Sequence, residues 1–100
     1  MKDRRFFPIL SLVLLMVFSL TEKAQADYQA QVDSIRREIP GLKGKTLLDA
    51  YYKIYNIYYY FGDQQQERQS IDDLLRMAER EGNLRMQGTA RVALLYYFYN

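Results

Sequence analysis

Phenols and carboxylates are the side chains with which this chain could do chemistry, because its 100 residues include neither cysteine nor histidine. The chain therefore lacks the commonest zinc ligand and the usual general base. Its most conspicuous cluster comprises Tyr51, Tyr52, Tyr55, Tyr58, Tyr59 and Tyr60. Tyrosines at helical spacing usually pack in a core, but tyrosine is also enriched at recognition hot spots. Because successive tyrosines point around the helix, some face outward. We predict that Tyr52, Tyr59 and Tyr60 do so and bind a partner.

The neighbouring carboxylates Asp72 and Asp73 raise the question of a metal or an acid–base site. Adjacent residues on a helix diverge by about 100°, so the two do not converge on one ion. They fit a solvated face better, with Arg76 nearby for pairing. The sequence also has no glycine-rich phosphate loop and no serine-centred elbow. We therefore expect no catalytic, cofactor-binding or metal-binding residues, and a protein that is not an enzyme.

The charge of the chain argues against nucleic acid as a partner. Four of the 14 basic residues and two of the 12 acidic residues lie in the first 26 positions. The remainder carries ten of each and is neutral, so it lacks the basic footprint of a nucleic-acid binder. A neutral, tyrosine-rich segment suits packing and recognition of protein or peptide.

Residues 1–26 have the organisation of a signal peptide. Basic residues near the start precede an apolar run over residues 6–20, which is shorter than the roughly 20 residues of a spanning helix. Ala24 and Ala26 then form the small-x-small pattern that signal peptidase reads. We predict cleavage after Ala26, export to the periplasm and no stable membrane span afterwards. The alternative is a leader that is retained as an uncleaved anchor.

Apolar periodicity predicts helices in the rest of the chain. Residues 27–45 form an N-terminal helix and a connection, because Val32, Ile35 and Ile39 share a stripe and Pro40-Gly41 follows. The next helix begins with Thr46 as N-cap, in an approximate capping box with Asp49, and stops at Gly62-Asp63. Its stripes are Leu47, Tyr51, Ile54 and Tyr58 and, beside them, Leu48, Tyr52, Tyr55 and Tyr59.

Two more helices follow, over residues 64–81 and from about Leu84. The third helix has an inner stripe made of Ile71, Leu74, Leu75 and Ala78. The apolar face of the fourth helix comprises Met86, Ala90, Ala93, Leu94, Tyr97 and Phe98. Gly82-Asn83 separates the two helices. Short connections between long helices predict an all-α fold of antiparallel helical hairpins.

Comparison of the chain with itself reveals a weak repeat. At a shift of 38 residues, Ile54, Ile57, Tyr58 and Tyr59 match Val92, Leu95, Tyr96 and Tyr97. A period of this size in a helical chain indicates a solenoid of helical pairs. Residues 46–100 resemble tetratricopeptide repeats, since the pattern W-x2-L-G-x2-Y falls on Tyr51, Ile54, Tyr55 and Tyr58. Tyr55 departs from the small residue of that pattern, whereas Ala93 keeps it in the next copy.

The resemblance implies a tetratricopeptide-like solenoid of about four helices after the signal peptide. The leader, the early Pro-Gly turn and the tyrosine-rich repeat are also similar to the N-terminal periplasmic regions of sensor histidine kinases and regulators in Bacteroidetes-type bacteria. The function implied is protein or peptide binding, as the start of a larger periplasmic sensor or scaffold. Two alternatives are the sensory N-terminal fragment of a two-component histidine kinase and a small structural envelope protein.

A tetratricopeptide-like array needs about three repeats for stability. The sequence supplies one full hairpin plus the start of the next, in residues 46–100. We therefore expect either further C-terminal repeats or self-association through Ala93, Leu94, Tyr97 and Phe98.

Overall fold

The computed structural model describes residues 27–99 and contains only helices and turns there, so the all-α prediction is confirmed. Residues 27–38 are helical. They are followed by the 3-10 turn η1 (Ile39–Gly41) and by α2 (Gly44–Phe61), α3 (Gln64–Arg80) and α4 (Leu84–Tyr99). The predicted leader and its cleavage site after Ala26 lie outside the described residues.

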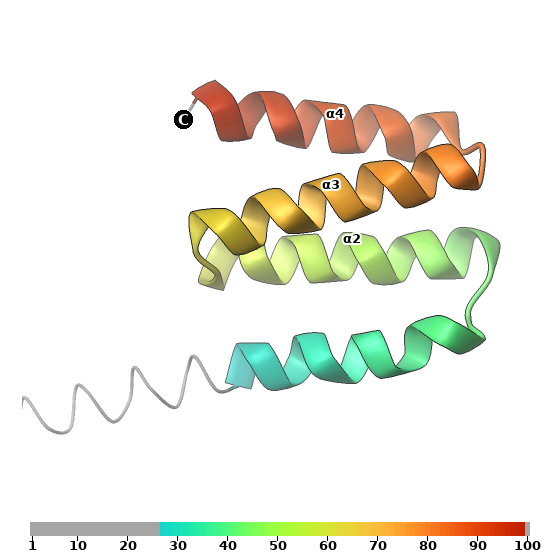
Figure 1. The fold of residues 1–100 in the computed structure, drawn as a ribbon, viewed down its shortest axis with the longest axis horizontal. Helices are drawn as coiled ribbons and strands as arrows, with labels where there is room; N and C mark the ends of the chain where they lie inside the picture. The colour runs from blue at the N-terminus through green and yellow to red at the C-terminus, as the bar shows by residue number, and fades with distance from the viewer. Residues whose placement is uncertain (1–26, 100) are drawn as a thin grey trace, which may run out of the picture. The chain divides into compact units, whose positions relative to one another are not determined.

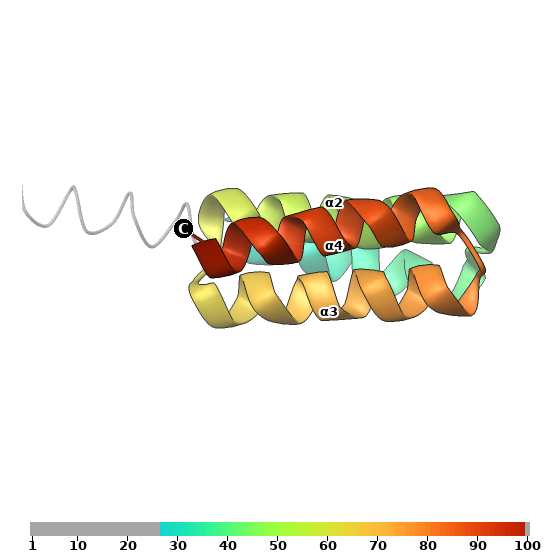
Figure 2. The ribbon, with the colours of Figure 1, turned by 90° about the horizontal axis from the view of Figure 1, so that it is seen from above.

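The chain divides into two compact units, residues 1–30 and 31–100. Only the helical residues 27–30 of the first unit are described. In the second unit, consecutive helices run antiparallel, and α3 packs against both α2 and α4 (Figure 1). Figure 2 shows α3 displaced to one side, while α2 and α4 lie on the other. The helices thus form antiparallel hairpins in two layers.

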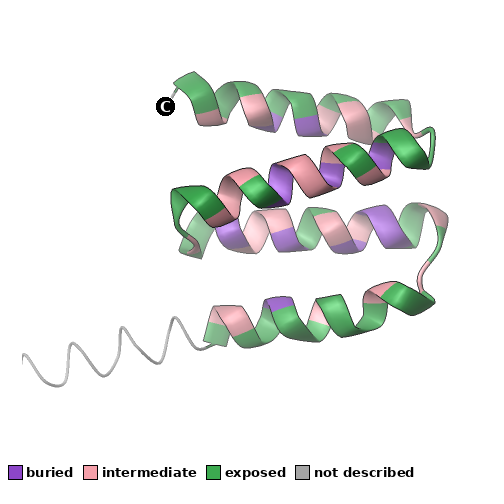
Figure 3. Cartoon of the chain, viewed as in Figure 1, coloured by how far each residue is buried: buried purple, intermediate pink, exposed green. Residues whose placement is uncertain are grey.

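The buried side chains lie where the helices face one another (Figure 3). Among residues 27–99, the largest fully buried side chains are those of Val32, Leu48, Ile71 and Leu74. The predicted inner stripe of α3 is confirmed for Ile71, Leu74 and Ala78, whereas Leu75 is half-buried. Because α3 has a helix on either side, its apolar stripe is the centre of the described core.

The connection before α2 differs from the prediction. Pro40 lies inside η1, where its fixed φ fits a 3-10 turn, and the N–H of Leu42 donates to the carbonyl of Ile39 at 3.0 Å. In this connection the left-handed conformation is adopted by Gly44, with φ 58°. α2 therefore begins at Gly44, and the predicted N-cap role of Thr46 is wrong because Thr46 lies within the first turn.

In the two later connections, hydrogen bonds cap the ends of the helices within a few residues. Gly62-Asp63 is the predicted turn, and the Asp63 carboxylate accepts a hydrogen bond from the Gln66 N–H at 2.8 Å. The Gln66 side chain accepts one from the Asp63 N–H at 3.2 Å, which completes a capping box. After α3, Gly82 adopts φ 67°, and the Asn83 N–H donates to the Ala78 carbonyl at 2.9 Å. Both turns hold α3 antiparallel to its neighbours.

We expect Asp63→Ala to lower the free energy of unfolding by about 1 kcal/mol, because the substitution removes one half of the capping box. Thermal unfolding followed by circular dichroism measures the change. Thr46→Ala is the matched control, since Thr46 lies inside α2 and caps nothing. Equal losses in the two variants would contradict this assignment of the caps.

Candidate functional site

Tyr52, Tyr59 and Tyr60, the three predicted binding residues, are exposed to 36%, 50% and 73%. By contrast, Tyr58 is buried under the Arg36 guanidinium, which lies 5.9 Å from its ring centroid. Ring centroids 5.0 to 6.2 Å apart link Tyr52, Tyr55, Tyr59 and Tyr60 into a continuous row along α2. The row therefore presents aromatic surface to solvent, and its role in binding stays a prediction.

A cleft of about 480 Å³ opens beside the C-terminal end of this row, and we call it the tyrosine cleft. It is lined by Tyr59, Tyr60, Gln64, Glu67, Tyr96 and Tyr97. α2, α3 and α4 each contribute two of these residues, because the antiparallel turns bring the end of α2, the start of α3 and the end of α4 together. Sequence reasoning selected Tyr59 and Tyr60 but missed Glu67. The 38-residue repeat, which aligns Tyr59 with Tyr97, was the signal for the tyrosines of α4.

A second cleft of about 460 Å³ lies nearer the other end of α2, and we call it the basic cleft. It is lined by Lys45, Asp49, Tyr52, Asn83, Arg85, Met86 and Thr89. The predicted binding residues are therefore divided, with Tyr52 in this cleft and Tyr59 and Tyr60 in the tyrosine cleft. Both clefts are lined by residues of α2 and α4, and the tyrosine cleft also by residues of α3; the tyrosine row of α2 runs from Tyr52 in one to Tyr59 and Tyr60 in the other.

The Glu67 carboxyl group gives the tyrosine cleft its electrostatic character. Partial burial raises its pKa above the ordinary value, because removal from water disfavours the charged form. No ion pair of Glu67 occurs within residues 27–99. Burial and, secondly, the charge of Glu67 raise the pKa of Tyr55, so this phenol keeps its proton at neutral pH and remains a hydrogen-bond donor.

The other carboxylates of α3 are engaged in ion pairs. Asp72 pairs with Arg68 at 3.2 Å, and Asp73 pairs with Arg76 at 3.0 Å. Each aspartate thus has its own partner, in agreement with the predicted divergence of the two side chains. Glu79 pairs with Arg91 of α4 at 3.6 Å. Among the described residues, no group of three or more acidic side chains is placed to hold a metal ion.

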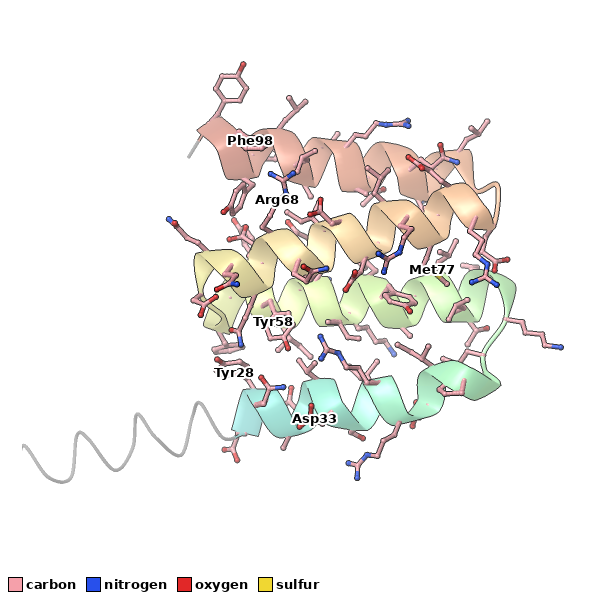
Figure 4. All side chains as sticks on the ribbon, in the orientation of Figure 1. Tyr28, Asp33, Tyr58, Arg68, Met77 and Phe98 are labelled. Carbon is pink, nitrogen blue, oxygen red and sulfur yellow. The ribbon has the colours of Figure 1, made fainter. Side chains whose placement is uncertain are left out.

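Arg68 shows how this end of the fold holds a cation. Its guanidinium lies 4.7 Å from the Phe98 ring centroid and 5.8 Å from that of Tyr97. Figure 4 shows Arg68 reaching from α3 toward Phe98 of α4. With Asp72 at 3.2 Å, the cation is therefore held by aromatic rings and a carboxylate together.

The residues of the predicted self-association surface on α4 are largely covered within the fold. Ala93 is buried, and Leu94 and Tyr97 are half-buried, because this side of α4 packs on α3. Of the four predicted residues, only Phe98 is exposed. The exposed apolar row of the helix instead comprises Val92, Leu95, Tyr96 and Tyr99. α4 is apolar on both sides, and periodicity selected the inward side; self-association through these four residues stays a prediction.

None of the family models, characterised protein sequences or solved structures compared with the chain matches it. Within residues 27–99, no helix combines the length and the apolar character needed to cross a membrane. The fold and the clefts thus define an all-α protein of antiparallel hairpins with two separate clefts, each lined by residues of both α2 and α4.

Proposed function

We propose that this chain is a tetratricopeptide-like helical-repeat module that binds a segment of a protein or peptide partner. The observation that carries the proposal is the tyrosine cleft, where four phenol rings from two helices surround a concave space. Tyrosine combines a large apolar face with a hydroxyl group and loses little conformational entropy when it is buried by a ligand. Such a cleft is suited to recognition.

The spacing of the two clefts along α2 fits a short extended segment. Tyr52 and Tyr59 are seven positions apart on α2, which corresponds to about 10 Å along the helix axis at roughly 1.5 Å per residue. An extended chain advances about 3.3 Å per residue. About three residues of a peptide would therefore reach from the basic cleft to the tyrosine cleft.

The amino-acid sequence supports a periplasmic location for this module. Basic residues, an apolar run and Ala24-Gln25-Ala26 follow one another in the order that is typical of the signal peptide of an exported protein. Fractionation of cells that express the full chain, with N-terminal sequencing, tests this part. A mature N-terminus at Asp27 in the periplasmic fraction is expected, and a cytoplasmic chain that begins at Met1 would contradict it.

We expect Tyr96→Ala to weaken peptide binding at least fivefold, because the substitution removes one wall of the tyrosine cleft. The measurement is a screen of an immobilised library of short peptides, followed by the dissociation constants of the peptides that bind the wild-type chain. Tyr99→Ala is the matched control, since Tyr99 is an exposed tyrosine of the same helix that does not line the cleft. A library without ligands, or equal losses in both variants, would contradict the proposal.

A further inference from the structure

The two clefts lined by residues of α2 and α4 are similar in volume and opposite in charge. Lys45 and Arg85 contribute two cations to the basic cleft, against the single carboxylate of Asp49. The described lining of the tyrosine cleft contains one carboxylate, Glu67, and no basic side chain. A partner segment that spans both clefts would therefore meet a negative site at one end and a positive site at the other.

We propose that the tyrosine cleft binds a cationic side chain, lysine or arginine, of the partner segment. This inference rests on the proposed function and specifies the ligand of that site. The cleft is lined by the phenol rings of Tyr59, Tyr60, Tyr96 and Tyr97, a type of ring whose face attracts cations, and Glu67 supplies the compensating charge. Gln64 adds a side-chain carbonyl that accepts a hydrogen bond from an ammonium or guanidinium group.

The fold already uses this chemistry at the neighbouring turn of α3. Arg68 lies against Tyr97 and Phe98 and pairs with Asp72, so one cation is held by two rings and a carboxylate. The tyrosine cleft also combines rings with a carboxylate; Arg68 lies against one of its rings, that of Tyr97, but no cation of residues 27–99 pairs with Glu67. A partner's cation would complete the set.

The raised pKa of Glu67 is consistent with this role. Partial burial removes water that would stabilise the charged carboxylate of Glu67, and a cation close to it would replace that stabilisation. Among the described residues, the cleft is otherwise lined by four tyrosines and Gln64, and Tyr55 lies close enough to feel the charge of Glu67. Glu67 is the acidic side chain of the described lining, and its charge therefore decides which ligand the cleft accepts.

The test uses the full-length chain and two acetylated, amidated tripeptides. One has lysine between two glycines, and the other has norleucine, which keeps the aliphatic stem and lacks the charge. Titrations are followed by NMR through the ring signals of Tyr96 and Tyr97 and the methyl signal of Met86. We expect the lysine peptide to shift the ring signals saturably, norleucine to bind at least threefold more weakly, and Met86 in the basic cleft to stay unchanged.

Two variants locate the interaction. Glu67→Gln should weaken the binding of the lysine peptide about three- to tenfold, whereas Glu79→Gln on the same helix, which removes the pair with Arg91, should not. Tyr96→Leu keeps an apolar wall but removes the ring face, and it should also weaken the binding. This second variant keeps the test decisive if Glu67→Gln alters the fold.

The outcomes separate the two proposals. If norleucine binds as well as lysine, or if Glu67→Gln and Tyr96→Leu bind lysine like the wild type, the cation inference fails. The proposed function still stands in that case if Tyr96→Ala abolishes the binding of neutral library peptides. If neither tripeptide shifts the ring signals and the library contains no ligand, both proposals fail.

Discussion

Leu74→Ala is expected to destabilise the protein by about 2 to 5 kcal/mol, the largest effect of any substitution considered. Leu74 is 0% exposed and lies on α3, which packs against both α2 and α4. Truncation removes apolar burial and leaves a cavity that a helix held on two sides closes only in part. Residues 27–100 number 74, and a globular domain of that size has a free energy of unfolding of roughly 4 to 11 kcal/mol. The expected loss is therefore a large share of the total stability.

Chemical unfolding followed by circular dichroism measures the effect. Leu95→Ala is the matched control, because it deletes the same atoms from a side chain that is 57% exposed on α4. A surface change of this kind is expected to stay within about 0.5 kcal/mol. A Leu74 variant as stable as the Leu95 variant would show that α3 is not the centre of the core.

The fold was largely predictable because the signals that define it are local. α3 has a single apolar stripe, formed by Ile71, Leu74 and Ala78. The period of this stripe therefore identified both the helix and the face of it that is buried. Gly62-Asp63 was also recognisable as a turn from its residue types alone. The start of α2 was less predictable, since Thr46 and Gly44 both fit a helix start and the choice depends on the path that Pro40 imposes on the chain.

The candidate site was only partly predictable, because it is assembled from three helices. Tyr59 and Tyr60 are conspicuous by residue type, and their exposure follows from the angular spread of tyrosines around α2. Glu67 carries no such signal, since it is one of many polar residues until the fold places it beside the tyrosines of α4. A site built from distant segments requires the helix packing, which periodicity alone does not specify.

Gly62→Ala is expected to destabilise the protein by about 1 to 3 kcal/mol, the cost typical of overpacking. An added Cβ would lie 2.9 Å from the Tyr58 carbonyl oxygen, 2.8 Å from Tyr58 Cδ1 and 3.0 Å from Gln66 Oε1. The carbonyl is backbone and accepts the hydrogen bond of the Gly62 N–H at 2.9 Å. Nor can the other two atoms move freely, because the Tyr58 ring is buried and the Gln66 side chain belongs to the capping box.

The same substitution at Gly88 is expected to have the opposite sign, which makes it the sharpest control. Gly88 is exposed within α4, and an added Cβ would meet nothing within 4 Å. Gly88→Ala should therefore stabilise the protein by about 0.5 to 1 kcal/mol, since alanine loses less backbone entropy than glycine on entering a helix. For a domain of this size, 1 kcal/mol shifts the melting temperature by roughly 4 to 8 °C, so thermal unfolding resolves both variants. If both variants melted at a higher temperature than the wild type, this result would contradict the close approach of Gly62 to Tyr58 and the tight turn between α2 and α3 that depends on it.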